Sequence, residues 1–150
     1  MGPMDSTKLV QAGYWSSYWH NGLIYASEKA RGLDIFELLP GAWFTQNEID
    51  AAKLVRFDHL NVQEQPQYVW PAAFVVARAY VDQLTRHNGL DGSRLTAISS
   101  ALTAAETLQG PARTAALTEL ANQLGRDAMT AADAPKVRLL AGTVSAIALE

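Results

Sequence analysis

The dipeptide Asn21-Gly22 constrains the fold of this chain most strongly, because it lies between two segments of strand-like sequence. Both residues adopt a positive φ angle at little cost, and a type I′ turn needs this at both of its central positions. The preceding segment 12–20 reads AGYWSSYWH, and the following segment 23–27 reads LIYAS. Aromatic side chains favour pleated strands. The sequence therefore predicts a β-hairpin.

A third strand is predicted at 33–38, where LDIFEL alternates after a polar connection ending in Gly32. We therefore expect a three-stranded antiparallel meander within residues 1–39. Successive residues of a strand face opposite sides. In the first strand this rule places Tyr14, Ser16 and Tyr18 on one face, and Trp15, Ser17 and Trp19 on the other.

Residues 40–70 are expected to hold one short helix and a long ordered connection. Pro40-Gly41 ends the sheet, and Thr45-Gln46-Asn47-Glu48 has the form of a capping box. The box predicts a helix over 46–55. Residues 56–70 are mixed and polar and give no periodic signal.

Residues 71–150 predict an antiparallel helical bundle, because leucine, valine and isoleucine recur there at helical spacing. The fold class is thus α+β: an N-terminal three-stranded β-meander followed by about four to five amphipathic helices. The start and stop signals after residue 70 are Pro71 in a first helical turn, Asn88-Gly89, Asp91 or Ser93, Gly110-Pro111, and Asp133 with Pro135.

Charge and composition exclude several functions for this chain. Its 150 residues carry a net charge of −3, with basic residues scattered rather than clustered, so no nucleic-acid footprint is present. The chain has no cysteine, which excludes disulfides and thiolate chemistry. No apolar run approaches the roughly 20 residues that span a bilayer, and residues 1–5 do not resemble a signal peptide.

No catalytic motif stands out in the sequence. His20, His59 and His87 are not at metal-ligand spacing from one another, and no Gly-rich phosphate loop or serine elbow is present. We therefore assign no catalytic residue, cofactor or metal. Glu28, Asp34 and Glu37 on the meander are interpreted as solvated surface groups, and the last two are expected on opposite faces.

Aromatic residues are the unusual feature, and two sets of them are candidate sites. The first set predicts a protein interface on the meander and consists of Tyr14, Trp15, Tyr18, Trp19 and Tyr25. The second set predicts a pocket between sheet and helices and consists of Trp43, His59 and Trp70. His59 is included because it lies in the irregular connection, where functional residues concentrate.

Residues 21–38, NGLIYASEKARGLDIFEL, resemble one unit of the LVIVD-repeat proteins, which are β-propeller-like repeat proteins of the bacterial surface and periplasm. Segment 13–19 is similar to the strand before their final unit, and 45–50 is similar to the start of the region after it. The resemblance implies the last repeat and helical tail of such a protein, located outside the cytoplasm. It carries over no catalytic residue.

A single repeat has open strand edges and cannot bury both of its faces. We therefore expect a non-enzymatic structural and interaction module. It would form a homo-oligomer, with a dimer favoured, or dock on the remainder of a larger repeat protein. The alternative is a small ligand-binding or enzyme domain that uses the pocket near Trp43, His59 and Trp70.

Overall fold

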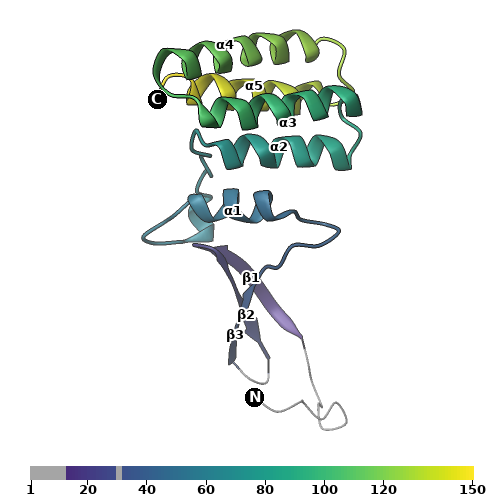
Figure 1. Cartoon of the computed structure of the whole chain (residues 1–150). Helices are drawn as coiled ribbons and strands as arrows, with labels where there is room; N and C mark the ends of the chain where they lie inside the picture. Colours follow the sequence, from purple (N-terminus) through teal and green to yellow (C-terminus); the bar gives the residue numbers. More distant parts are fainter. Residues whose placement is uncertain (1–12, 30–31) are drawn as a thin grey trace. The chain divides into compact units, whose positions relative to one another are not determined.

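The structure is a computed structural model that describes residues 13–29 and 32–150 (Figure 1). It confirms the α+β class, with one antiparallel sheet followed by five α-helices in the described chain. The strands are β1 (Tyr14–His20), β2 (Leu23–Glu28) and β3 (Gly32–Glu37). The helices are α1 (Gln46–Leu54), the short 3₁₀ helix η2 (Val62–Glu64), α2 (Phe74–Arg86), α3 (Gly92–Thr107), α4 (Gly110–Asp127) and α5 (Ala134–Ile147). The expected first strand residue, Ala12, lies outside the described residues.

The chain forms two compact units, which we call the sheet unit and the helical unit. The described sheet unit consists of the strands up to Leu39 together with Arg56–Pro66. The helical unit consists of Pro40–Val55 and Gln67–Glu150. Residues 40–70 are therefore shared between the two units.

The sheet has the strand order β1-β2-β3 and is closed at one end by the expected hairpin turn. Asn21 and Gly22 have φ angles of 49° and 97°, so both central turn residues are in the positive-φ region. His20 pairs with Leu23 directly across this turn. The predicted hairpin turn at Asn21-Gly22 is therefore confirmed.

A β-bulge at Trp15 overturns the expected face of Tyr14. Tyr14 pairs with Glu28 but Ser16 pairs with Ser27, so Trp15 is an extra residue in β1. Tyr14 consequently lies on the face opposite Tyr18, and its ring meets Phe36 edge to face with centroids 5.7 Å apart. The expectation that Tyr14 shares a face with Ser16 and Tyr18 is wrong, because strict alternation ends at a bulge.

Cross-strand partners share a face, so the register defines two faces of the sheet. The Tyr25 face carries Ser16, Tyr18, His20, Leu23, Tyr25, Ser27, Leu33, Ile35 and Glu37. The Trp19 face carries Tyr14, Ser17, Trp19, Ile24, Ala26, Glu28, Asp34 and Phe36. Asp34 and Glu37 lie on opposite faces, as expected.

Local capping determines where the helices begin. The box at Thr45 and Glu48 is present, with both reciprocal hydrogen bonds. Asp91, rather than Ser93, caps α3, and Asp133 caps α5. The expected start of α2 at Pro71 is wrong, because Ala73 is the extended N-cap and Phe74 the first helical residue. The fixed φ of proline suits the extended approach to a helix as well as its first turn.

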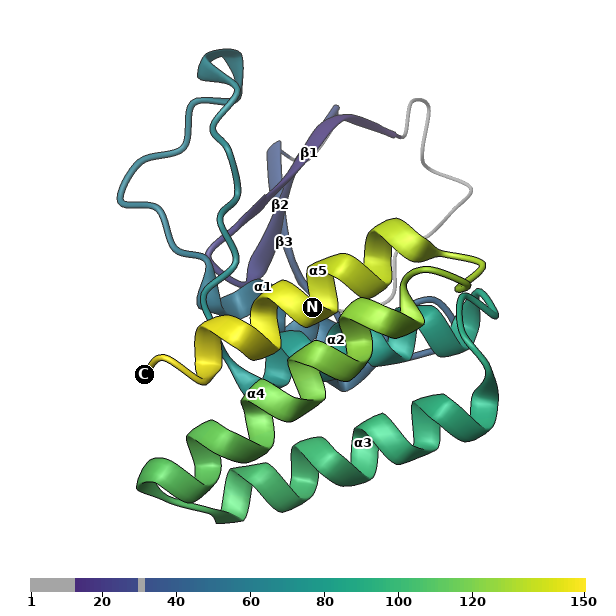
Figure 2. The ribbon, with the colours of Figure 1, turned by 90° about the horizontal axis from the view of Figure 1, so that it is seen from above.

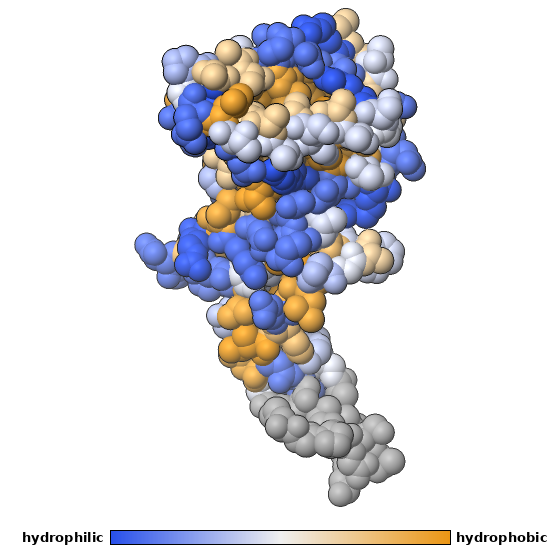
Figure 3. All heavy atoms as spheres, viewed as in Figure 1, coloured by the Kyte–Doolittle hydropathy of each residue, from blue (hydrophilic) through white to orange (hydrophobic). Residues whose placement is uncertain are grey.

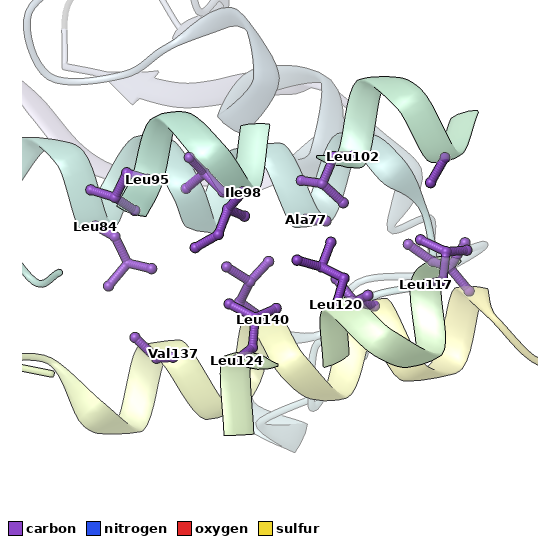
Figure 4. Packing of buried hydrophobic residues seen from close by; sticks show 14 of the residues in the cluster. Ala77, Leu84, Leu95, Ile98, Leu102, Leu117, Leu120, Leu124, Val137 and Leu140 are labelled. Carbon is purple, nitrogen blue, oxygen red and sulfur yellow. The ribbon is translucent and has the colours of Figure 1, made fainter. Parts of the chain in front are cut away.

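The core of the helical unit lies among α2, α3, α4 and α5. Each of these helices packs on the next, and α2 also packs on α5. Figure 2 shows α3, α4 and α5 alongside one another. Leucine and isoleucine side chains from the facing helices meet in the interior (Figure 4), and Leu84, Ile98, Leu102, Leu117, Leu124 and Leu140 are fully buried.

The end of α2 is a tight junction with the start of α5. Asn88 has a φ of 53°, and Gly89 donates to the Leu84 carbonyl at 2.8 Å, which is the hydrogen bond of a Schellman motif. The Gly89 carbonyl in turn accepts from the backbone of Asp133, the N-cap of α5. A Cβ at Gly89 would lie 2.7 Å from Leu84 Cδ2 and 2.9 Å from Asp133 Cβ.

We expect Gly89→Ala to lower the free energy of unfolding by about 1–3 kcal/mol, because the added methyl overlaps side chains of α2 and α5. Chemical denaturation followed by far-ultraviolet circular dichroism measures this. The matched control is Gly125→Ala in α4, where a Cβ meets nothing within 4 Å. That change should stabilise by about 1 kcal/mol through helix propensity. Equal effects of the two substitutions would contradict the tight junction.

Candidate binding sites

Asn21 joins the hairpin to the connection 56–66 within the sheet unit. Its side-chain Nδ2 donates to the Phe57 carbonyl at 2.9 Å, and its Oδ1 accepts from the Phe57 N–H at 2.9 Å. The amide thus pairs with one backbone residue as a neighbouring strand would. We call this pair of hydrogen bonds the Asn21 clamp.

The side chain of Asn21 also contacts the neighbouring His20 ring. The amide orientation is set by Phe57, so the second Nδ2 hydrogen is available to His20 Nε2, which lies 3.2 Å away. Nε2 accepts this hydrogen bond in the tautomer that carries its hydrogen on Nδ1. Nδ1 is buried and has no hydrogen-bond partner within 13–29 and 32–150.

The connection and the Tyr25 face enclose an open groove of about 510 Å³ in the sheet unit. The strand residues lining it are Tyr18, His20 and Tyr25, and the connection contributes Asp58, His59, Leu60, Asn61 and Val62. The hydrogen-bonding groups of the Asn61 side chain are used locally, because they cap η2 and bond to Glu64. The groove therefore joins two predicted interface residues to the predicted pocket residue His59.

The predicted interface residues are divided between the two faces and the bulge. Tyr18 and Tyr25 lie on the Tyr25 face, whereas Tyr14 and Trp19 lie on the Trp19 face. Trp15 is 72% exposed at the bulge, where the Lys29 ammonium lies 4.8 Å from its ring centroid. The set therefore does not form one continuous aromatic surface on one side of the sheet.

Exposed aliphatic side chains on β3 escaped the sequence analysis. Leu33 and Ile35 are 61% and 55% exposed on the Tyr25 face, and Phe36 is 41% exposed on the other. Figure 3 shows hydrophobic residues at the surface over the strands. The sequence signal for this set is the alternation of LDIFEL, which places Leu33 and Ile35 on one face and Phe36 on the other.

The solvated interpretation of the meander carboxylates is wrong for Glu28. Its side chain is buried, with 5% of the residue exposed, and it accepts a hydrogen bond from the Gly13 N–H at 3.4 Å. Asp34 is half-buried and accepts from the Tyr14 hydroxyl at 2.9 Å. The bulge explains the second contact, because it brings Tyr14 to the face that carries Asp34.

A second hollow lies in the helical unit, with a volume of about 310 Å³. It is lined by Glu48, Ala51, Trp70, Val76, Ala79, Tyr80, Gln83, Lys136 and Leu139. A neighbouring hollow of about 420 Å³ shares Trp70, Tyr80 and Leu139 with it. We call the two together the α2–α5 groove.

An ion pair supports one wall of this groove. Both Glu48 carboxylate oxygens accept from Arg86, at 2.8 and 2.6 Å, and Thr45 donates its backbone N–H to the same carboxylate. The Arg86 hydrogen bond is the main cause that lowers the pKa of Glu48 to about 2, against the opposing effect of burial. Burial raises the pKa of Tyr80, which lies in the same groove.

The second predicted set, Trp43, His59 and Trp70, is distributed over both units. His59 lines the sheet-unit groove, and Trp70 lines the α2–α5 groove of the helical unit. Trp43 belongs to the helical unit and is 80% exposed. Trp70 and His59 therefore each mark a hollow, but in separate units.

Comparisons with known proteins match no family model, no curated protein and no solved structure. The resemblance to LVIVD repeats therefore stays a prediction. The described chain holds no group of three or more His, Cys, Asp or Glu side chains placed to bind a metal ion. Among its helices, none combines the length and apolar character needed to cross a bilayer.

We expect Asn21→Gly to raise the amide hydrogen-exchange rate of Phe57 by about fivefold or more, because a hydrogen bond contributes about 1 kcal/mol. Glycine keeps the positive φ and removes the clamp together with the contact to His20. The control is Asn88→Gly, which changes the other Asn-Gly turn, where φ is 53°. Unchanged protection at Phe57 in Asn21→Gly would show that the clamp does not hold the connection.

The Glu48–Arg86 pair should make stability depend on pH. Because folding lowers the pKa of Glu48 from 4.5 to about 2, its contribution is complete above about pH 4.5 and is lost as pH falls towards 2. The Glu48 side chain is 8% exposed, and the shift corresponds to about 3 kcal/mol. Glu48→Gln should remove this part of the acid dependence of the free energy of unfolding.

Glu106→Gln is the control for this measurement. Glu106 pairs with Arg78 at 2.7 Å, but its side chain is 49% exposed. Water screens such a pair, so we expect its loss to cost less than about 1 kcal/mol at any pH. Identical acid profiles for the Glu48 and Glu106 variants would contradict the buried ion pair.

Proposed function

We propose that this chain is a non-enzymatic interaction module whose sheet unit pairs with a second copy through the outer edge of β3. The observation that carries the proposal is the exposure of Leu33 and Ile35 beside that edge. Within the described chain β3 is an edge strand beside β2, and an edge strand can bind a further strand through the backbone donors and acceptors on its outer side. An added strand would satisfy these groups and cover the aliphatic side chains at the same time.

The two edges of the sheet differ in their fitness for pairing. The β1 edge contains the bulge at Trp15, and a bulge disrupts the regular ladder that another strand needs. The six residues of β3 pair with β2 without a register shift. The regular edge is therefore the better template for strand pairing, and we place the proposed interface at β3.

Symmetry and charge select a register for the pairing. A two-fold axis perpendicular to the sheet must lie midway between two copies of the same residue, because directly opposed side chains share a face. An axis at Asp34 would oppose two carboxylates, which is unfavourable. An axis at Ile35 opposes two isoleucines and places each Leu33 opposite Glu37 of the other copy. We assign the interface to this register.

The exposed apolar area predicts a weak dimer. Covering the exposed parts of Leu33, Ile35 and Phe36 contributes roughly 1 kcal/mol each, given about 1.5–3 kcal/mol for complete burial. Association costs about 4 kcal/mol or more, and the new backbone hydrogen bonds add about 1 kcal/mol each. We therefore expect a dissociation constant of about 0.1–1 mM.

Weak pairing between single units agrees with the resemblance to LVIVD repeats. In a repeat array, neighbouring units are linked covalently, so a weak interface is effective at the high local concentration that the linkage creates. A terminal unit with one regular open edge is suited to ending such an array. The pairing of two copies of this chain would use the same edge.

We expect sedimentation equilibrium from about 50 µM to 1 mM to show a monomer–dimer equilibrium that Ile35→Lys abolishes. The new lysines would oppose each other on the two-fold axis, whereas a solvent-exposed site tolerates lysine in the monomer. Leu139→Lys is the matched control, since Leu139 in α5 is 54% exposed and Ile35 is 55% exposed.

A parent chain that stays monomeric throughout this range would overturn the proposal. So would a dimer that persists in Ile35→Lys. Dissociation by Trp15→Ser instead would assign the interface to the bulge and its aromatic residue, not to the β3 edge.

A further inference from the structure

The α2–α5 groove is lined by apolar side chains and has free space beside the small residues of α5. Trp70 and Leu139, each about half exposed, line both of its hollows. In the second hollow, the lining residues of α5 include Gly142 and Ala146, and a Cβ at Gly142 would meet nothing within 4 Å. A planar apolar ring could therefore contact Trp70 and Leu139 and occupy the space beside Gly142.

Each hollow also carries one cation. Lys136 lines the first hollow, where its ammonium is 3.5 Å from Asp133, and Arg138 lines the second. Arg138 makes no ion pair with the described residues. The carboxylate in the lining, Glu48, is already neutralised by two hydrogen bonds from Arg86. Lys136 is thus partly neutralised by Asp133, and Arg138 is the cation beside the apolar wall of the second hollow.

We propose that the α2–α5 groove binds a small aromatic carboxylate, with its ring against Trp70 and Leu139 and its anion at Lys136 or Arg138. The hollows, at about 310 and 420 Å³, are the size of small-molecule sites. A phosphate or other compact polyanion would leave the apolar wall uncovered, and a neutral ring would leave Arg138 without an anion among the described residues. The site involves no residue of β3 and is independent of the pairing proposed above.

Isothermal titration of the full chain with 1-naphthoate tests the proposal, with 1-naphthamide as the neutral probe of the same shape. We expect naphthoate to bind with a dissociation constant near 1 mM or below and about fivefold more tightly than the amide, as partly exposed ion pairs contribute up to about 1 kcal/mol. Equal affinity for the two probes, or no binding of naphthoate up to about 10 mM, would overturn the proposal.

Gly142→Leu tests the location of the site without disturbing the helix. The new side chain should occupy the second hollow and weaken naphthoate binding by about tenfold or more. Gly125→Leu in α4 is the matched control, because a Cβ there also meets nothing within 4 Å. Both variants should keep the circular dichroism of the parent chain, and unaltered binding to a folded Gly142→Leu would place the ligand elsewhere.

Lys136→Met and Arg138→Met test the recognition of charge. We expect their combination to weaken naphthoate binding about fivefold and to leave naphthamide binding unchanged. Arg126→Met is the control, since Arg126 lies on α4 with its side chain 65% exposed and 3.5 Å from Glu119. A similar loss for both probes would assign Lys136 and Arg138 a role in packing instead of anion recognition.

Discussion

The burial of apolar surface divides this molecule into two parts of very different kinds. The helical unit has a continuous interior, built from the facing stripes of α2 to α5. In the described sheet unit, Ala26 is the buried hydrophobic residue, while Leu33 and Ile35 remain more than half exposed. A three-stranded sheet is too small to enclose a core by itself. The helices are thus stabilised by their own packing, whereas the sheet is held mainly by local hydrogen bonds.

Asn21 and Trp15 show how a small sheet is organised without a core. Asn21 closes the hairpin through its positive φ, and its side chain also secures the connection at Phe57. Trp15 forms the bulge that breaks the regular ladder of β1 and turns Tyr14 towards Phe36 and Asp34. These two residues leave β3 as the regular edge. The surface that we propose for pairing therefore depends on local backbone geometry at the opposite side of the sheet.

The helical unit owes its groove to the same residues that shape its helices. Gly142 and Ala146 lack the side-chain volume to fill the space beside Trp70. Small residues elsewhere in the unit serve close packing instead, as at Gly89, where a methyl group would overlap Leu84. Two glycines in one unit thus have opposite roles, and the neighbouring atoms determine which role each has.

The sequence by itself determined the elements that depend on short-range interactions. The Asn21-Gly22 pair defined the hairpin, and the Thr45–Glu48 box and Asp133 defined two helix starts, because turns and caps need particular side chains within a few residues. The helical spacing of apolar residues in 71–150 predicted the bundle, and Leu117, Leu124 and Leu140 are fully buried in it. Only the tertiary structure decided the face of Tyr14, the burial of Glu28, and the membership of residues 56–66 in the sheet unit. A bulge shifts every residue beyond it, and the Asn21 clamp spans thirty-six positions, so neither follows from local preference. The grooves depend on how Trp70 meets α5 and how His59 meets the strands, and contacts between distant segments are fixed by packing, not by the sequence around each residue.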